Sequence, residues 1–126
     1  MTDTAISLCF PAKREYAIFL RTAVSGAAAA DGLTLDALED LREAALEAFS
    51  ALTESAGEGT QALCDIYRAQ ENAVSLHLRL SGRTGVPAAD DTADITRAVL
   101  LPLVNRVQVF YDACGCTGVR MTLQVG

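Results

Sequence analysis

The segment of residues 34–56 most constrains the fold, because its apolar residues recur at steps of three and four. At ~100° per residue this spacing gathers them on one side of a helix, where they can pack on a core. The carboxylates fall on the opposite side, so the predicted helix is amphipathic. Thr34 is an N-cap candidate, and Gly57 and Gly59 provide a stop. The apolar stripe is Leu38, Leu41, Ala45, Ala48, Phe49 and Leu52, and the acidic face is Asp36, Asp40, Glu43, Glu47 and Glu54.

The length of 126 residues, of which 51% are hydrophobic, predicts one domain over residues 1–126 with its own core. The formal net charge is −6, and the 10 Lys and Arg residues form no cluster along the sequence. Nucleic acids and acidic lipids bind basic surfaces, so neither is an expected partner. No stretch approaches the ~18 apolar residues that span a bilayer, and no basic N-terminal region precedes an apolar run. We therefore expect a cytoplasmic protein.

The segments before and after this helix show strand and helix patterns in turn. Residues 6–10 predict a strand that Pro11 ends, because proline lacks a backbone N–H. Residues 14–30 predict a helix, and the break at Asp31 and Gly32 joins it to the central helix. The strand patterns around 62–66 and 73–80 predict a hairpin, with residues 68–72 as its turn.

The last part of the chain begins with a predicted loop over residues 81–91, whose end can cap a helix that carries Ile95, Val99 and Leu103. Pro102 is unfavourable inside a helix, so this helix is either kinked there or starts nearer to Pro102. Residues 107–111 and 119–125 alternate and predict a closing hairpin around a turn at 112–118. This order of elements predicts an α+β fold, a two-layer sandwich of a mostly antiparallel sheet with helices on one face.

The four cysteines fit a reducing compartment better than a disulfide framework, because a chain of this size needs no staples. Cys9 and Cys64 lie in apolar strand patterns and are predicted to be buried free thiols. Cys114 and Cys116 could bind a soft metal, but a zinc site needs four ligands and the only histidine, His77, lies in a distant strand pattern. The alternative is a strand-connecting turn at this pair, and no metal site is assigned.

Two parts of the chain resemble the bacterial anti-sigma factor serine/threonine kinases. Their first half has a PAK-type strand end, a helix, a glycine-containing turn and a helix with E-x-x-x-N; it is similar to residues 10–52, FPAKREYAIFLRTAVSGAAAADGLTLDALEDLREAALEAFSAL. Their last helix and closing hairpin are similar to residues 100–125, LLPLVNRVQVFYDACGCTGVRMTLQV. The resemblance implies a histidine-kinase-like ATPase fold, also called the GHKL or Bergerat fold.

The resemblance also implies roles for single residues in the first half. Glu47 matches the glutamate that activates the substrate hydroxyl in the family. The asparagine that ligates Mg²⁺ in the family is replaced by Ala51, which has no oxygen to offer a hard cation. The alternative interpretation of Glu47 is a solvated carboxylate on the acidic helix face.

The family's D-x-G-x-G box, whose aspartate reads adenine, should follow the predicted strand 73–80. Leu80 stands where that aspartate belongs, while Gly82 and Gly85 match the two glycines and are the candidate cofactor-binding residues. Asp94 and Thr96 stand near expected glycines of the phosphate loop, where side chains obstruct the approach of a phosphate. The nucleotide-binding motifs are therefore degenerate.

These observations lead to a regulatory domain of the anti-sigma factor type that binds a protein, without ATP hydrolysis or kinase activity. The family implies a sigma factor or an anti-sigma factor antagonist as the partner, and no cofactor is expected. One alternative is an active ATP-dependent serine kinase that needs ATP and Mg²⁺. A further alternative is a domain that binds another small ligand in the vacated nucleotide pocket.

The helix at residues 14–30 adds a second prediction about partners. Tyr16, Phe19, Leu20 and Ala23 give it a broader apolar side than packing on a sheet requires. Such a patch predicts contact with another protein chain, including a second copy of this one, and the family's N-terminal region contributes to dimerisation. Burial of these residues against the sheet is the alternative.

Overall fold

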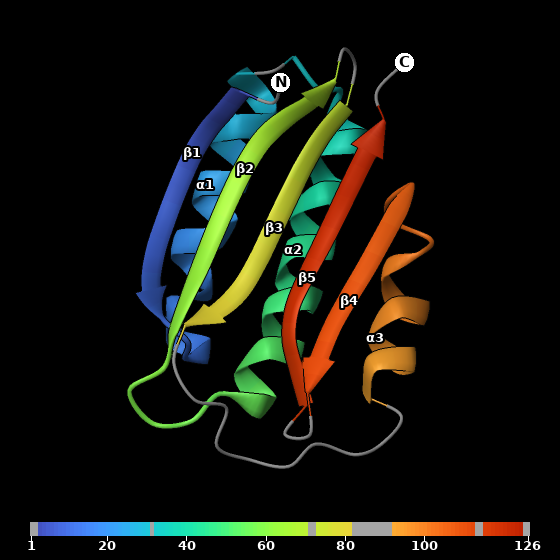
Figure 1. Cartoon of the computed structure of the whole chain (residues 1–126). Helices are drawn as coiled ribbons and strands as arrows, with labels where there is room; N and C mark the ends of the chain where they lie inside the picture. The colour runs from blue at the N-terminus through green and yellow to red at the C-terminus, as the bar shows by residue number, and fades with distance from the viewer. Residues whose placement is uncertain (1–2, 31, 71–72, 82–91, 113–114, 125–126) are drawn as a thin grey trace.

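The computed structural model describes residues 3–30, 32–70, 73–81, 92–112 and 115–124. Within these residues, one layer is a five-stranded sheet in which every pair of neighbouring strands is antiparallel. Its strands are β1 (Asp3–Pro11), β2 (Gln61–Gln70), β3 (Ala73–Ser81), β4 (Arg106–Asp112) and β5 (Gly115–Gln124). Their order is β1-β2-β3-β5-β4, so β1 and β4 form the edges (Figure 1).

The second layer consists of helices on one face of this sheet (Figure 1). After a 3₁₀ turn η1 (Arg14–Tyr16) come α1 (Ala17–Ala30), α2 (Leu35–Ser55) and, later in the chain, α3 (Thr92–Leu100). Figure 1 shows α1 behind β1 and β2, α2 behind β3 and β5, and α3 beside β4. The predicted α+β class, with an antiparallel sheet and helices on one face, is confirmed. Among the described residues, no helix is both long and apolar enough to cross a membrane.

Helix α2 has the predicted ends and orientation. The Thr34 side-chain oxygen accepts a hydrogen bond from the backbone N–H of Ala37 at 3.2 Å, which caps the first turn. Gly59 follows the helix with a φ of 79°, a conformation that favours glycine. Most of the predicted apolar stripe is fully buried, while the predicted acidic face is exposed. The helix therefore turns its carboxylates to solvent.

The core lies between the helices and the inner face of the sheet. The rings of Phe10 on β1 and Phe49 on α2 pack with their centroids 5.5 Å apart. Burying each large apolar side chain of this kind contributes about 2 kcal/mol. The largest buried side chains include Phe49, Leu20, Leu41, Leu52, Ile66, Leu76, Leu78, Leu100 and Met121.

The uncovered face of the sheet carries a polar row that crosses all five strands. In the strand register, Ser7 pairs with Asp65, Asp65 with His77, His77 with Arg120, and Arg120 with Gln108. Because side chains alternate across a strand, these residues point away from the buried apolar neighbours. This row is therefore polar and charged, unlike the residues on the inner face.

The position of Pro102 corrects both alternatives considered above. Helix α3 ends at Leu100, two residues before Pro102, so the helix is neither kinked by this proline nor started near it. The N–H groups of Leu103 and Val104 both bond to the carbonyl of Leu100, at 2.9 and 3.2 Å, which closes the helix with a tight turn. Pro102 lies exposed in this turn, where its missing N–H breaks no helical bond.

Two predicted turns are shorter in the structure. β5 begins at Gly115, and the register pairs Asp112 with Gly115 and Tyr111 with Cys116, so the predicted turn 112–118 is largely strand. Likewise β2 extends to Gln70, which pairs with Ala73, although the prediction placed residues 68–70 in a turn. In both places strand pairing overrides the polar and glycine-rich composition that favours turns. Residues 71–72 and 113–114 lie outside the described residues.

Candidate functional site

One side of α2 carries the residue predicted to be catalytic. Glu47, Ser50, Ala51 and Glu54 follow one another at steps of three, one and three residues, which places them along one face of the helix. The two glutamates are two turns apart, about 10 Å along the helix axis. Glu47 and Glu54 are exposed, whereas Ala51 is only 8% exposed.

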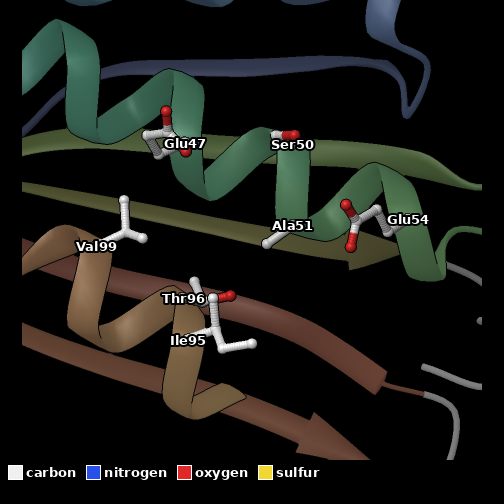
Figure 2. A pocket seen from close by; sticks show the side chains of 7 residues that line it. All are labelled: Glu47, Ser50, Ala51, Glu54, Ile95, Thr96 and Val99. Atoms are coloured by element: carbon white, nitrogen blue, oxygen red, sulfur yellow. The ribbon is translucent and has the colours of Figure 1, made fainter. Parts of the chain in front are cut away.

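Helix α3 faces this side of α2 with Ile95, Thr96 and Val99. Figure 2 shows these side chains across from Ala51, with the Ala51 methyl directed toward α3. Thr96 is 7% exposed, while Ile95 and Val99 are partly open to solvent. The spacing of one and four residues along α3 puts the three side chains on the helix face turned toward α2.

Together the two helices enclose a cleft of about 290 Å³, which we call the α2–α3 cleft (Figure 2). It is lined by two exposed carboxylates, by the hydroxyl groups of Ser50 and Thr96, and by apolar side chains, and its most buried lining residues are Ala51 and Thr96. Among the described residues that line it there is no lysine, arginine or histidine. A negative rim without a cation repels a phosphate group, so the described walls of the α2–α3 cleft are unsuited to triphosphates.

The structure brings three of the sequence-predicted positions into this cleft. Glu47, Ala51 and Thr96 all line it, although Thr96 is far from the other two in the chain. Ala51 places a methyl group where the resemblance implies a magnesium ligand. Asp94, predicted near a phosphate-loop glycine, is exposed in the first turn of α3. Asp94 and Thr96 therefore belong to a helix rather than to a glycine loop.

The remaining predicted nucleotide residues do not line this cleft. Leu80 lies near the end of β3, half-buried, and packs against the core cluster. An apolar side chain there cannot accept a hydrogen bond from a base. Gly82 and Gly85, the candidate cofactor-binding residues, lie outside the described residues.

Four residues of the cleft were missed by sequence reasoning: Ser50, Glu54, Ile95 and Val99. Ser50 and Glu54 carry a signal that was available, because they follow Glu47 at helical spacing and therefore share its face. Ile95 and Val99 were predicted only as apolar residues of their helix. They are 55% and 41% exposed, since α3 lies at the edge of the helical layer and opens toward the cleft.

A second candidate surface lies on α1 and includes the predicted apolar side. Leu20 is fully buried, but Phe19 is 58% exposed and its neighbour Ile18 is 64% exposed. The rings of Tyr16 and Phe19 stack with centroids 5.8 Å apart. We call Tyr16, Ile18 and Phe19 the α1 patch. Burial accounts for Leu20 and in part for Tyr16 and Ala23, which are partly buried and pack against the core, whereas Phe19 is left exposed.

The described cysteines differ in burial, and burial limits the reactivity of two of their thiols. Burial, and secondarily Asp65, raises the pKa of Cys64 to about 12, and burial also raises the pKa of Cys116. Since metals and electrophiles react with the thiolate, neither is a ready ligand or nucleophile. Cys9 was predicted to be buried but is exposed on the outer face of β1, where its thiol donates to Gln61 Oε1 at 2.9 Å. Strand alternation explains the error, since Leu8 and Phe10 point inward.

Cys114, the other half of the CGC pair, lies outside the described residues. Among the residues that are described, no group of three or more histidine, cysteine, aspartate or glutamate side chains is arranged to hold a metal ion. No protein-family model matches the chain, and a search of the curated proteins finds no match either.

Proposed function

We propose that this chain is a regulatory domain of the anti-sigma factor kinase type that has lost nucleotide chemistry and binds another protein through the α1 patch. The observation that carries the proposal is the exposure of Ile18 and Phe19, at 64% and 58%, on a helix whose other side is fully packed. Exposed large apolar side chains that lie together mark interaction surfaces. The Tyr16 ring, which is partly buried against the core, stacks on Phe19.

The histidine-kinase-like fold is part of this proposal. Its support is the order of elements, with a strand, two helices, a hairpin, a helix and a second hairpin, and the position of Glu47 at a cleft beside the last helix. The loss of nucleotide chemistry is supported by Ala51 and Thr96 in that cleft, which supply a methyl group and a helical side chain in place of a metal ligand and a glycine loop.

The partner class follows from the resemblance: a sigma factor, or a small antagonist protein that competes for the same surface. A second copy of the chain is the homodimer version. An aromatic and aliphatic patch suits either, because such residues dominate the binding energy of protein interfaces.

Sedimentation equilibrium on the wild type and on Phe19→Glu tests the homodimer version. Burying a charge at an apolar contact removes several kcal/mol of binding, so Phe19→Glu should shift self-association by at least tenfold. Ala29→Glu is the matched control. Ala29 is exposed on the same helix outside the patch, and the substitution introduces the same charge. A monomeric wild type rules out the homodimer.

Calorimetric titration with the sigma factors and antagonist proteins of the source organism tests the other version. Binding that Phe19→Glu abolishes and Ala29→Glu retains is the expected result. The absence of binding to any of them, together with a monomeric wild type, would overturn the proposed function.

The active-kinase alternative makes an opposite prediction about nucleotides. We expect millimolar ATP with Mg²⁺ to leave the melting temperature unchanged, because Leu80 and Ala51 replace the groups that would read adenine and hold the metal. A ligand that binds the native state stabilises it by RT ln(1 + [L]/Kd), so real binding is visible as a rise of several degrees. Such a rise would restore the kinase alternative.

A second candidate function is the binding of a small ligand in the α2–α3 cleft. The observation that favours it is the cleft itself, with a volume of about 290 Å³, which is lined by the carboxylates of Glu47 and Glu54 on α2 and by the apolar side chains of Ile95 and Val99 on α3. This lining suits an amphipathic cation, whose charge pairs with a carboxylate while its apolar part covers Ile95 and Val99. Titration with alkyl diamines, followed by NMR of the Ala51 methyl group, measures this binding.

A further inference from the structure

A hollow of about 530 Å³ lies where α3 meets the edge strand β4 and continues onto β5. Three arginines line it, and each comes from a different element: Arg97 from α3, Arg106 from β4 and Arg120 from β5. We call this place the arginine hollow. Figure 1 shows α3 beside β4 at this edge of the sheet, with β5 as the next strand inward.

The charge of the arginine hollow is opposite to that of the whole chain. The net charge is −6 and there are 10 lysines and arginines, so three of these cations around one hollow are a marked concentration. No aspartate or glutamate is among the described residues that line it. All three arginines are exposed, and none makes an ion pair with a described residue.

The contrast with Arg79 shows what an arginine on the same sheet does when an acid is near. Arg79 on β3 forms an ion pair with Asp65 at 3.0 Å, and that carboxylate also accepts a hydrogen bond from Ser7 at 2.7 Å. Arg79 is thereby neutralised. Arg120, on the adjacent strand β5, forms no ion pair with a described residue, and its guanidinium carbon lies 6.0 Å from the centroid of the Phe110 ring. The positive charge therefore concentrates on the β4 side of the sheet.

Neutral polar groups and the apolar side chains of Leu101 and Val107 complete the lining of the arginine hollow. The Asn105 side-chain oxygen accepts a hydrogen bond from the backbone N–H of Gln124 at 2.7 Å, so its amide nitrogen is left as the donor. Gln108 and Thr122 add an amide and a hydroxyl group. Residues with guanidinium, amide and hydroxyl groups thus line one space.

We propose that the arginine hollow is a binding site for a multivalent anion of phosphate chemistry. Three arginines carried by three different elements suit the oxygens of a tetrahedral phosphate, which accept hydrogen bonds from several directions. A carboxylate is planar and pairs best with a single arginine fork in its plane. The volume of about 530 Å³ holds a ligand larger than one phosphate group, such as a di- or triphosphate. This site is distinct from the α2–α3 cleft and independent of protein binding by the α1 patch.

The test is a titration of the full chain with inorganic pyrophosphate at low ionic strength, with a chelator present to exclude metal-mediated binding. Calorimetry measures affinity, and two-dimensional NMR locates the site through the arginine side-chain Nε–H signals. We expect saturable binding that shifts Arg97, Arg106 and Arg120, and that weakens as salt rises because screening reduces the attraction. If the wild-type chain does not bind pyrophosphate at millimolar concentration, the proposal is wrong, and no variant is needed to show it.

Single substitutions identify the groups that bind. Arg97→Gln, Arg106→Gln and Arg120→Gln should each weaken pyrophosphate binding about tenfold or more, as expected for the loss of a hydrogen bond to a charged group. Arg21→Gln, at an exposed position on α1, is the matched control with the same change of charge. An equal loss in Arg21→Gln would show that the attraction is diffuse and that no site exists.

Two further ligands test the chemistry. Citrate carries a similar charge on carboxylates and should bind more weakly than pyrophosphate; tighter citrate binding overturns the phosphate assignment. An acidic peptide of glutamates tests a macromolecular occupant. If the peptide binds while pyrophosphate does not, the proposal is wrong and the arginine hollow is a protein contact.

Discussion

The α2–α3 cleft and the arginine hollow share helix α3 as a wall and carry opposite charges. Ile95, Thr96 and Val99 face the cleft, whereas Arg97 and Leu101 face the hollow. Residues four apart lie on the same side of a helix, so these two sets occupy different sides of α3. One short helix thus separates an acidic site from a basic one.

The opposite charges of the two sites arise in different ways. In the cleft, Glu47 and Glu54 both belong to helix α2. Their spacing along the helix is enough to place them on one face, and no other element is needed. The hollow takes its arginines from three elements and exists only when β4, β5 and α3 have assembled. A net charge of −6 therefore says little about any particular surface.

Leu100→Ala should have the largest effect on the stability of the chain and on both sites. Leu100 is fully buried and ends α3, so it anchors the wall that the two sites share. Removing a buried leucine side chain costs about 2–5 kcal/mol, and both sites should be weakened together. Urea unfolding gives the change in stability, and pyrophosphate titration gives the effect on the arginine hollow.

Leu101→Ala is the control for this prediction. The neighbouring side chain is 48% exposed, so its truncation should cost about 0.5 kcal/mol or less. A similar loss in both variants, or a loss under about 1 kcal/mol in Leu100→Ala, would mean that α3 is not anchored by Leu100.

Much of the fold could be predicted because local pattern and tertiary burial agree. In α2 the three- and four-residue spacing, the Thr34 cap and the acidic face all appear as predicted. The errors arise where pairing with a distant strand decides the outcome. Cys116 was assigned to a turn by its glycine neighbours, but pairing with Tyr111 places it in β5.

The candidate sites were harder to predict from the sequence than the fold. The acidic rim could be predicted from Glu47 alone, since Glu54 follows two turns later. The arginine hollow could not, because Arg97, Arg106 and Arg120 are separated in the chain and only the sheet order brings them together. The absence of a basic run in the sequence therefore did not exclude a basic surface.

Asp65→Asn should remove the acidic partner of Arg79 on the uncovered face of the sheet. The hydrogen bond from Ser7, and then Arg79, lower the pKa of the Asp65 carboxyl against the opposing effect of burial. A lowered pKa means that this carboxylate stabilises the fold above its unfolded pKa of ~3.9, and that the contribution is lost as pH falls through the folded value. We expect Asp65→Asn to cost about 0.5–1 kcal/mol at neutral pH, because the pair is partly solvated.

Urea unfolding at neutral and acidic pH measures this cost. The difference between wild type and variant should shrink as pH falls, since the wild-type carboxylate is then protonated as well. A difference that is the same at all pH values would show that the carboxylate charge is not what stabilises this part of the sheet.

Arg120→Gln should raise the pKa of His77 toward its ordinary value. Burial lowers this pKa most, and Arg120 is the next cause. A lowered histidine pKa means that the unfolded chain takes up the proton first as pH falls below ~6.5, so acid destabilises the fold in this range. The variant should lose less stability there. NMR titration of the imidazole is the measurement, and Arg97→Gln is the control because Arg97 does not act on His77.

The smallest effect is expected for Glu47→Gln in the α2–α3 cleft. Glu47 is exposed and makes no ion pair with a described residue, so the substitution should change stability by about 0.5 kcal/mol or less. Removing one carboxylate should also leave pyrophosphate binding at the arginine hollow unchanged, because α3 lies between the two sites and salt screens exposed charges. A loss of about 2 kcal/mol or more in urea unfolding would show instead a buried, paired carboxylate of the kind that catalytic sites use. The opposite charges of the two sites would then reflect a functional acid in the cleft rather than a solvated helix face.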